Sequence, residues 1–191
     1  MPGDTGSVAR RTLTLLSAVL ALLGATAATA SAGGLAAPPS ACPGQTRLDA
    51  PVPAQEHAML CMVNYARAQV GLGALGVNTE LEGSAREKTR DIFRCDSFSH
   101  YACGREFAYW IRASGYMASE CWRAGENLAF GSGTYGSVRS IFRAWMRSTE
   151  HRENVLGDYA ETGIDVATGT LEGFGGTRVW TQHFGSHCSA G

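Results

Sequence analysis

The residues with the clearest capacity for chemistry are one carboxylate and two imidazoles, which stand in three separate segments of the chain. Glu126 lies in GENLAFG, between two glycines and directly before apolar residues. Acidic side chains are rarely buried without a partner, so Glu126 either lies in solvent at a bend or faces a site that supplies one. His100, in FSH, and His151, in STEHRENVL, are able to supply it. We therefore predict that His100, Glu126 and His151 meet in one cavity.

Two imidazoles and a carboxylate at one point suit three kinds of chemistry. Neutral imidazoles and carboxylate oxygens bind divalent cations, so His100 and His151 are candidate ligands of Zn²⁺ or Mg²⁺. A carboxylate beside a histidine also raises the pKa of the imidazole and orients its tautomer, which would serve a hydrolase. The third alternative is a hydrogen-bonded polar cluster that fixes the packing or holds a ligand without turnover.

A nucleophile is not apparent beside these residues. Ser99 precedes His100, and Ser148 is near His151, but neither serine lies in a G-x-S-x-G segment. The candidate catalytic residues are accordingly His100, Glu126 and His151, and the sequence leaves open whether the protein is an enzyme.

Four helices are predicted from apolar residues at helical spacing, with the ranges 55–70, 79–94, 105–114 and 138–147. The second begins with a T-x-x-E capping box formed by Thr79 and Glu82, and Ser137 is the expected N-cap of the fourth. In the first helix, Asn64 and Arg67 share a face. They are either a solvated polar stripe or the residues that tie this helix to the rest of the domain.

Strands are predicted late in the chain, at 162–167 and 178–184, where apolar residues alternate with others. Trp180, Gln182 and Phe184 share one face of the second strand. GENLAFG is either a strand or a helical turn. Helices that come before strands predict an α+β fold with a small antiparallel sheet. His57, His183 and His187 have no matched role, and we predict that they lie on the surface.

The composition and the N-terminus indicate a secreted globular protein. The chain has 191 residues, of which 45% are hydrophobic and 17% charged, and its formal net charge of −1 gives no indication of nucleic-acid binding. Arg10 and Arg11, an apolar run of about 11 residues and then small residues predict a signal peptide over 1–32. A membrane span needs about 20 apolar residues, so we expect none after signal removal. Residues 33–53 form the predicted linker, and 54–191 the folded domain.

All six cysteines follow the predicted signal peptide, which is typical of a disulfide-bonded secreted chain. Cys95 and Cys103 bracket FSH, so we predict that they pair and hold His100 in place. The alternative, a zinc–cysteine site, is disfavoured because the chain has no C-x-x-C segment.

Taken in order, these motifs resemble the CAP superfamily of cysteine-rich secretory, antigen 5 and pathogenesis-related 1 proteins, in particular its bacterial SCP-like branch. The resemblance covers about residues 57–185 and rests on LCMVNYARAQVGLGAL, FSH, GENLAFG, WMRSTEHRENVL, GIDVA and VWTQHFG. It implies an α-β-α sandwich with a small antiparallel sheet between helical layers. It also implies a central cavity lined by two histidines and two acids.

Three of the family's four cavity residues have a match in this chain, and the fourth does not. His100 matches the family's histidine after the second helix, Glu126 its GEN glutamate, and His151 its SPGHR histidine. The position of the family's second acid is occupied by Ser148 in this chain, so Glu150 is the candidate substitute. The surrounding motif also differs, because this chain has STEHR where the family has SPGHR.

Two functions follow as hypotheses. The first is a secreted, non-enzymatic CAP-domain protein that binds an extracellular ligand, such as a lipid, a cell-wall component or a protein. The second is a divalent-metal-assisted extracellular hydrolase that uses His100, Glu126 and His151.

Overall fold

The computed structural model describes residues 34–119 and 121–188. The helices are α1 (Val52–Gln69), α2 (Thr79–Arg94), α3 (Tyr109–Ala113), α4 (Val138–Arg147) and α5 (Thr149–Val155), with short 3-10 turns η2 (Ala102–Gly104) and η3 (Gly133–Gly136). The strands are β1 (Gly76–Val77), β2 (Trp122–Ser132), β3 (Glu161–Leu171) and β4 (Phe174–His187). The predicted signal peptide, residues 1–32, lies outside the described residues.

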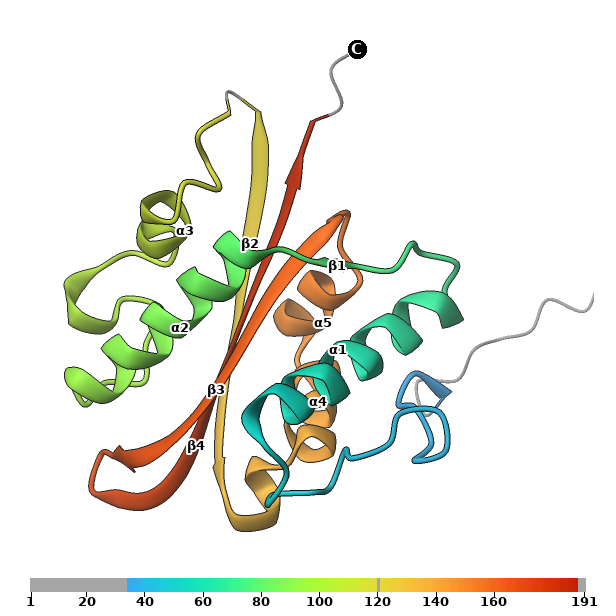
Figure 1. The fold of residues 1–191 in the computed structure, drawn as a ribbon, viewed down its shortest axis with the longest axis horizontal. Helices are drawn as coiled ribbons and strands as arrows, with labels where there is room; N and C mark the ends of the chain where they lie inside the picture. The colour runs from blue at the N-terminus through green and yellow to red at the C-terminus, as the bar shows by residue number, and fades with distance from the viewer. Residues whose placement is uncertain (1–33, 120, 189–191) are drawn as a thin grey trace, which may run out of the picture.

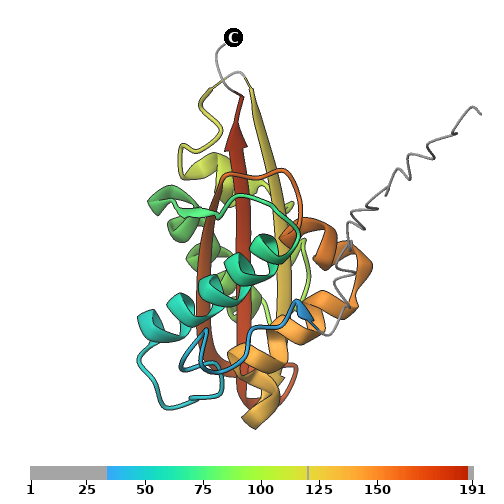
Figure 2. The same cartoon turned by 90° about the vertical axis from the view of Figure 1, so that its right-hand side faces the viewer.

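Two helical layers enclose one sheet. Figure 1 shows α2 and α3 on one side of the long strands, and α1, α4 and α5 on the other. Figure 2 shows α1 crossing in front of the strands, with α4 and α5 beside it. The predicted α+β class and the α-β-α sandwich are therefore confirmed.

The sheet has the strand order β1-β3-β4-β2. Its three long strands are antiparallel, and the two-residue β1 adds a parallel pair to β3. GENLAFG is extended, as one of its two predicted alternatives requires, because it forms most of the edge strand β2. In the register of β2 and β4, Glu126 lies opposite His183 and Asn127 opposite Gln182. Since neighbours across a sheet share a face, Glu126 and His183 point to the same layer.

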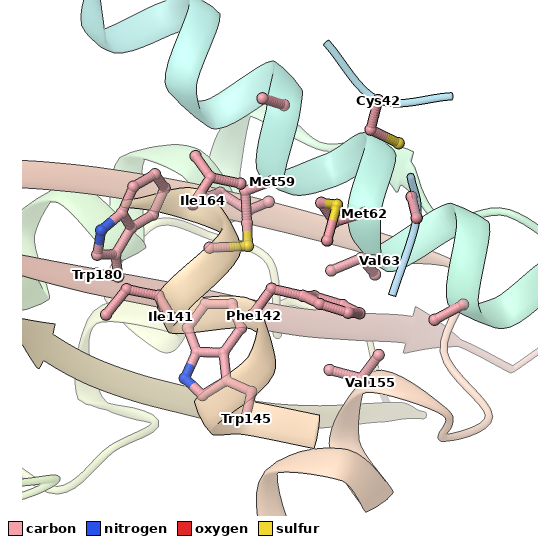
Figure 3. Close-up of a cluster of buried hydrophobic side chains, with 14 of the residues drawn as sticks. Cys42, Met59, Met62, Val63, Ile141, Phe142, Trp145, Val155, Ile164 and Trp180 are labelled. Atoms are coloured by element: carbon pink, nitrogen blue, oxygen red, sulfur yellow. The ribbon is translucent and has the colours of Figure 1, made fainter. Parts of the chain in front are cut away.

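The larger core lies between the sheet and the layer of α1, α4 and α5. Figure 3 shows Met59 and Met62 of α1 facing Ile141, Phe142 and Trp145 of α4 across this core. On the other face, smaller clusters lie under α2 and α3. Both faces of the sheet are therefore dry, so polar side chains on either face need partners within the protein.

The helix termini differ from the prediction in two places. The N-cap of α2 is Asn78, whose side-chain oxygen accepts from the backbone N–H groups of Glu80 and Leu81. The predicted Thr79–Glu82 capping box is wrong, because the helix begins one residue earlier than that box requires. The predicted helix at 105–114 is shorter, since only Tyr109–Ala113 is α-helical. Ser137 caps α4 as predicted, by accepting from the N–H of Ser140.

Asn64 and Arg67 tie α1 to the rest of the domain. The Asn64 amide exchanges two hydrogen bonds with the backbone of Leu75. Arg67 is 3% exposed, and its guanidinium donates to the carbonyls of Gly73, Val155, Gly157 and Tyr159 at 2.7–3.0 Å. Of the two interpretations of these residues, the solvated stripe is excluded.

The six cysteines form three disulfides, Cys42–Cys61, Cys95–Cys103 and Cys121–Cys188. The predicted Cys95–Cys103 pair is confirmed, and the bridges fit an oxidising compartment. Within residues 34–119 and 121–188, no helix has both the length and the apolar content needed to cross a membrane.

Two glycines allow other parts of the chain to approach the sheet closely. A Cβ on Gly163 of β3 would lie 2.0 Å from the carbonyl carbon of Leu81, in the first turn of α2. A Cβ on Gly185 of β4 would lie 2.3 Å from the Tyr116 hydroxyl. The position of α2 over the sheet therefore depends on the missing side chain at Gly163.

Candidate functional site

The centre of the candidate site is the Glu126 carboxylate, which β2 directs toward α2. Its side chain is 1% exposed, and both of its oxygens accept hydrogen bonds from imidazoles. Oε1 is 2.6 Å from Nδ1 of His100, and Oε2 is 2.8 Å from Nε2 of His183. Burial alone would raise the pKa of Glu126, but the hydrogen bonds from His100 and His183 and the charge of Lys88 outweigh it, so the pKa lies below its ordinary value. Glu126 is therefore ionised at neutral pH.

His100 connects this buried carboxylate to solvent. It lies in the loop closed by the Cys95–Cys103 bridge, and the ring of Phe98 in the same loop packs against Phe130 of β2 with 4.6 Å between centroids. Half of the His100 side chain is exposed. Because an ionised carboxylate only accepts, Nδ1 of His100 carries the proton toward Glu126. A neutral ring then has Nε2 as a free acceptor.

His183 is the residue that the sequence interpretation placed wrongly. It was predicted at the surface, yet it is 0% exposed, because α2 covers the face of β4 on which it lies. Its Nε2 donates to Glu126, and its Nδ1 is 2.7 Å from the hydroxyl of Ser84 on α2. That hydroxyl is also 2.8 Å from the carbonyl oxygen of Leu81. The alternation that puts Trp180, Gln182 and Phe184 on one face already assigns His183 to the other, and this signal could have identified it.

Lys88 completes the buried cluster. It is the only lysine of the chain, is 1% exposed, and places Nζ 3.8 Å from Oε1 of Glu126. The same ammonium donates to the carbonyl of His100 at 2.5 Å. Burial lowers the pKa of Lys88, and the charges of Glu126, Asp91 and Glu106 oppose that effect. Lys88 therefore holds both the carboxylate and the backbone of the loop that presents His100.

His151 approaches from the opposite helical layer. It lies on α5, and its backbone carbonyl accepts from the side chain of Asn127, the neighbour of Glu126 on β2. Partial burial and the charge of His100 lower the pKa of His151, whereas the charge of Glu150 raises it. The charge of His100 therefore acts on the ring of His151. In the described part of the chain, no hydrogen bond joins the His151 ring to Glu126.

The two remaining predicted positions lie at the start of α5. Ser148 is its N-cap and accepts from the N–H of His151, so it has a local structural role. Glu150 is exposed in the first turn of this helix. Its carboxylate acts on the site only through the charge that it adds near His151.

The donor set has a limited fit to a divalent cation. Nε2 of His100 and the ring of His151 are available, whereas both oxygens of Glu126 are already bonded. Catalytic zinc sites have three protein ligands, and among the described residues no group of three or more His, Cys, Asp or Glu side chains has a suitable arrangement.

A separate hollow of about 210 Å³ lies at the β1–β3 edge of the sheet. It is lined by Glu56, Leu60, Val77, Glu82, Thr162 and Ile164, together with Pro53 and His57. Burial, and then the charges of Asp165 and Glu82, raise the pKa of Glu56 to about 7, while Arg86 and the N–H of Val166 oppose this. Glu56 therefore takes up a proton near neutral pH.

This raised pKa gives a testable pH dependence of stability. In the unfolded chain Glu56 ionises near pH 4.3, whereas the folded protein keeps its proton until about pH 7. The protonated carboxyl therefore favours folding at low pH, and this contribution is lost as the pH rises through about 7. We expect Glu56→Gln to raise Tm relative to the wild type at pH 8 and to change it little at pH 5. Thermal unfolding of both proteins at the two pH values measures this, and an equal difference at both would contradict it.

Comparisons with known proteins agree with this fold. The profile of the cysteine-rich secretory protein family, CAP, matches residues 60–184. The uncharacterized protein YkwD of Bacillus subtilis is 30% identical over 152 residues, which are 78% of this chain and 54% of YkwD. The chain thus spans about half the length of that curated relative.

Solved structures with the same fold come from three bacteria. An extracellular protein containing an SCP domain from Bacillus anthracis has a TM-score of 0.57 at 18% identity, over 70% of this chain and 40% of its own. An outer surface protein from Borrelia burgdorferi has a TM-score of 0.55 at 18% identity, over 68% and 90%. A cysteine-rich secretory protein from Staphylococcus aureus has a TM-score of 0.52 at 20% identity, over 70% and 39%. At these identities the likeness shows the fold alone.

Proposed function

The chain belongs to the CAP family of cysteine-rich secretory proteins, and from this premise we propose that it is a secreted protein that binds an extracellular ligand without turning it over. The ligand contacts the exposed part of His100 and the neighbouring His151, while Glu126 stays buried beneath them. Lipids, cell-wall components and proteins are the candidate ligand classes.

The observation that carries this proposal is the burial of the Glu126 carboxylate, both of whose oxygens accept hydrogen bonds from within the protein. A general acid or base must reach the substrate or a water beside it, but the two oxygens of Glu126 are bonded to His100 and His183. Ser84, His183 and Glu126 follow the order of a hydrolase triad. However, Ser84 is 1% exposed and faces the sheet from the inner side of α2, so a substrate does not reach its hydroxyl. The cluster orients His100 and does not present a nucleophile.

The second candidate, a metal-assisted hydrolase, is favoured by one observation. A carboxylate that accepts from one ring nitrogen of a histidine, and leaves the other free, is typical of metal-binding histidines, and His100 has this arrangement with Glu126. The lowered pKa of His151 keeps its ring in the neutral form that metals require. His100 and His151 would hold the ion, which would supply a Lewis acid for hydrolysis.

Calorimetric titration with Zn²⁺ and Mg²⁺ distinguishes the two candidates. We expect at most weak binding, with Kd of about 1 mM or above because only two imidazoles are available, and loss of that binding in His100→Ala/His151→Ala. We also expect no turnover of fluorogenic esters, phosphodiesters or glycosides, with or without added metal. Turnover by the wild type that disappears in the double variant would replace the binding proposal with the hydrolase.

Ligand capture tests the binding proposal directly. Immobilised wild-type protein is incubated with a detergent extract of the secreting cell's envelope, and retained lipids and glycans are identified by mass spectrometry. A compound retained by the wild type and by the exposed-histidine control His57→Ala, but not by His100→Ala/His151→Ala, is the expected result. Equal retention by all three proteins would contradict a site at His100 and His151.

A further inference from the structure

The outer face of α4 carries a hollow that the candidate site does not use. Its volume is about 310 Å³, and the residues that line it include Phe130 and Tyr135 together with Arg143 and Arg147. Ser140, Ile141 and Ala144 complete the lining. We call this hollow the α4 groove. The groove therefore combines aromatic residues with cationic ones.

The aromatic side chains of the α4 groove are exposed yet held in place. Phe130 is 49% exposed and Tyr135 is 78% exposed. The hydroxyls of Ser137 and Ser140 both donate to the carbonyl of Thr134, at 2.7 and 2.8 Å. The turn also packs so tightly that a Cβ on Gly131 would lie 2.6 Å from the carbonyl of Tyr135. A rigid turn that presents a large ring to solvent loses little conformational entropy when a ligand covers it.

The charge of the α4 groove has one sign. Arg143 and Arg147 are one helical turn apart and exposed, and α4 contains no acidic residue. Neither arginine has an ion-pair partner within residues 34–119 and 121–188. Two uncompensated guanidinium groups side by side, on a chain of formal net charge −1, complement an anionic partner.

We propose that the α4 groove binds an anionic glycan chain. The two arginines pair with its carboxylate or phosphate groups, and the ring of Tyr135 packs against the apolar face of a sugar ring. A glycan is favoured over an anionic membrane because the arginines line a hollow together with Tyr135, whereas membrane insertion needs apolar side chains that protrude. This surface is separate from the proposed ligand site at His100 and His151 and does not depend on it.

Fluorescence anisotropy with labelled oligosaccharides tests the proposal. The probes are an oligogalacturonate, which carries carboxylates, a phosphorylated pentamannose, which carries phosphates, and a neutral maltooligosaccharide of similar length. We expect the wild type to bind at least one anionic probe at low salt, more weakly as salt is added, and not to bind the neutral probe. Arg143→Gln/Arg147→Gln and Tyr135→Ala should each raise Kd by at least about 10-fold.

Two controls make the result specific. Arg90→Gln/Arg112→Gln removes the same charge from exposed arginines of α2 and α3, on the other side of the sheet, and should leave Kd unchanged. His100→Ala/His151→Ala should also leave it unchanged, which separates this surface from the proposed ligand site. Failure to bind either anionic probe, an equal loss in either control, or co-sedimentation with phosphatidylglycerol vesicles in place of oligosaccharide binding would overturn the proposal.

Discussion

Glu126→Gln is expected to destabilise the folded protein by about 3–5 kcal/mol, because it leaves a buried cation without its anion. The amide keeps the size of the carboxylate, so the loss reports charge and hydrogen bonding and not a cavity. Lys88 would remain 1% exposed, with no carboxylate at 3.8 Å, and two imidazole N–H donors would lose a charged acceptor. Urea unfolding at pH 7, followed by far-UV circular dichroism, measures the change.

A second substitution separates the contribution of the unpaired Lys88 charge from the rest of the stability lost in Glu126→Gln. Lys88→Met in the Glu126→Gln background removes the unpaired ammonium, and we expect it to restore about 1 kcal/mol or more. Glu150→Gln is the matched control, because Glu150 is exposed, and it should change stability by no more than about 0.5 kcal/mol. A Glu126→Gln protein as stable as the wild type would contradict an ionised, buried carboxylate.

The pH dependence of this effect has a definite sign. The pKa of Glu126 in the folded protein is lowered, so its contribution to stability is present above the ordinary pKa of about 4.3. It is lost as the pH falls through the lowered value. The stability difference between the wild type and Glu126→Gln should therefore be constant from about pH 6 upward and narrow in acid.

Gly163→Ala is expected to destabilise the protein by about 3 kcal/mol or more, since the added methyl has no space. It would lie 2.0 Å from the carbonyl carbon of Leu81 and 2.1 Å from the backbone nitrogen of Glu82. These are backbone atoms of α2, so no side-chain rotation relieves the overlap and the helix must move. Ser84 and Lys88 would move with it, away from His183 and Glu126.

Gly83→Ala is the matched control for this substitution. Gly83 lies within α2, and a Cβ there meets no atom within 4 Å. Alanine is favoured over glycine in a helix, so we expect this variant to be more stable by about 0.5–1 kcal/mol. Chemical denaturation of both variants gives opposite signs if α2 lies directly on Gly163. A Gly163→Ala protein as stable as the wild type would show that α2 does not lie directly on Gly163.

Much of the fold follows from local pattern. The apolar stripe of Val138, Ile141, Phe142 and Trp145 and the serine before it define α4 with its cap, and both are confirmed. The alternation around Ile164 and around Trp180 identifies β3 and β4, although both strands extend beyond their predicted ranges. The start of α2 was less predictable, because Asn78 and Thr79 are both acceptable caps and only the backbone geometry distinguishes them.

The candidate site was predictable in part for a physical reason. His100 was paired with Glu126 because a buried carboxylate needs a partner, and the contact follows. Lys88 was not predicted in the site, because a lysine is rarely buried and its partner lies on a different element. His183 was predicted at the surface because no motif assigned it a role. A sheet covered on both faces leaves no exposed position at the centre of β4, and with this condition its strand alternation predicts burial.

The order of the disulfides has a consequence for how the chain matures. Each cysteine is joined to the next cysteine along the sequence, in the pairs 42–61, 95–103 and 121–188. A polypeptide that crosses a membrane from its N-terminus therefore exposes each correct partner before any later competitor emerges. In an exported chain, oxidation during translocation would favour the native connectivity, so that an oxidase would suffice without shuffling of mispaired intermediates.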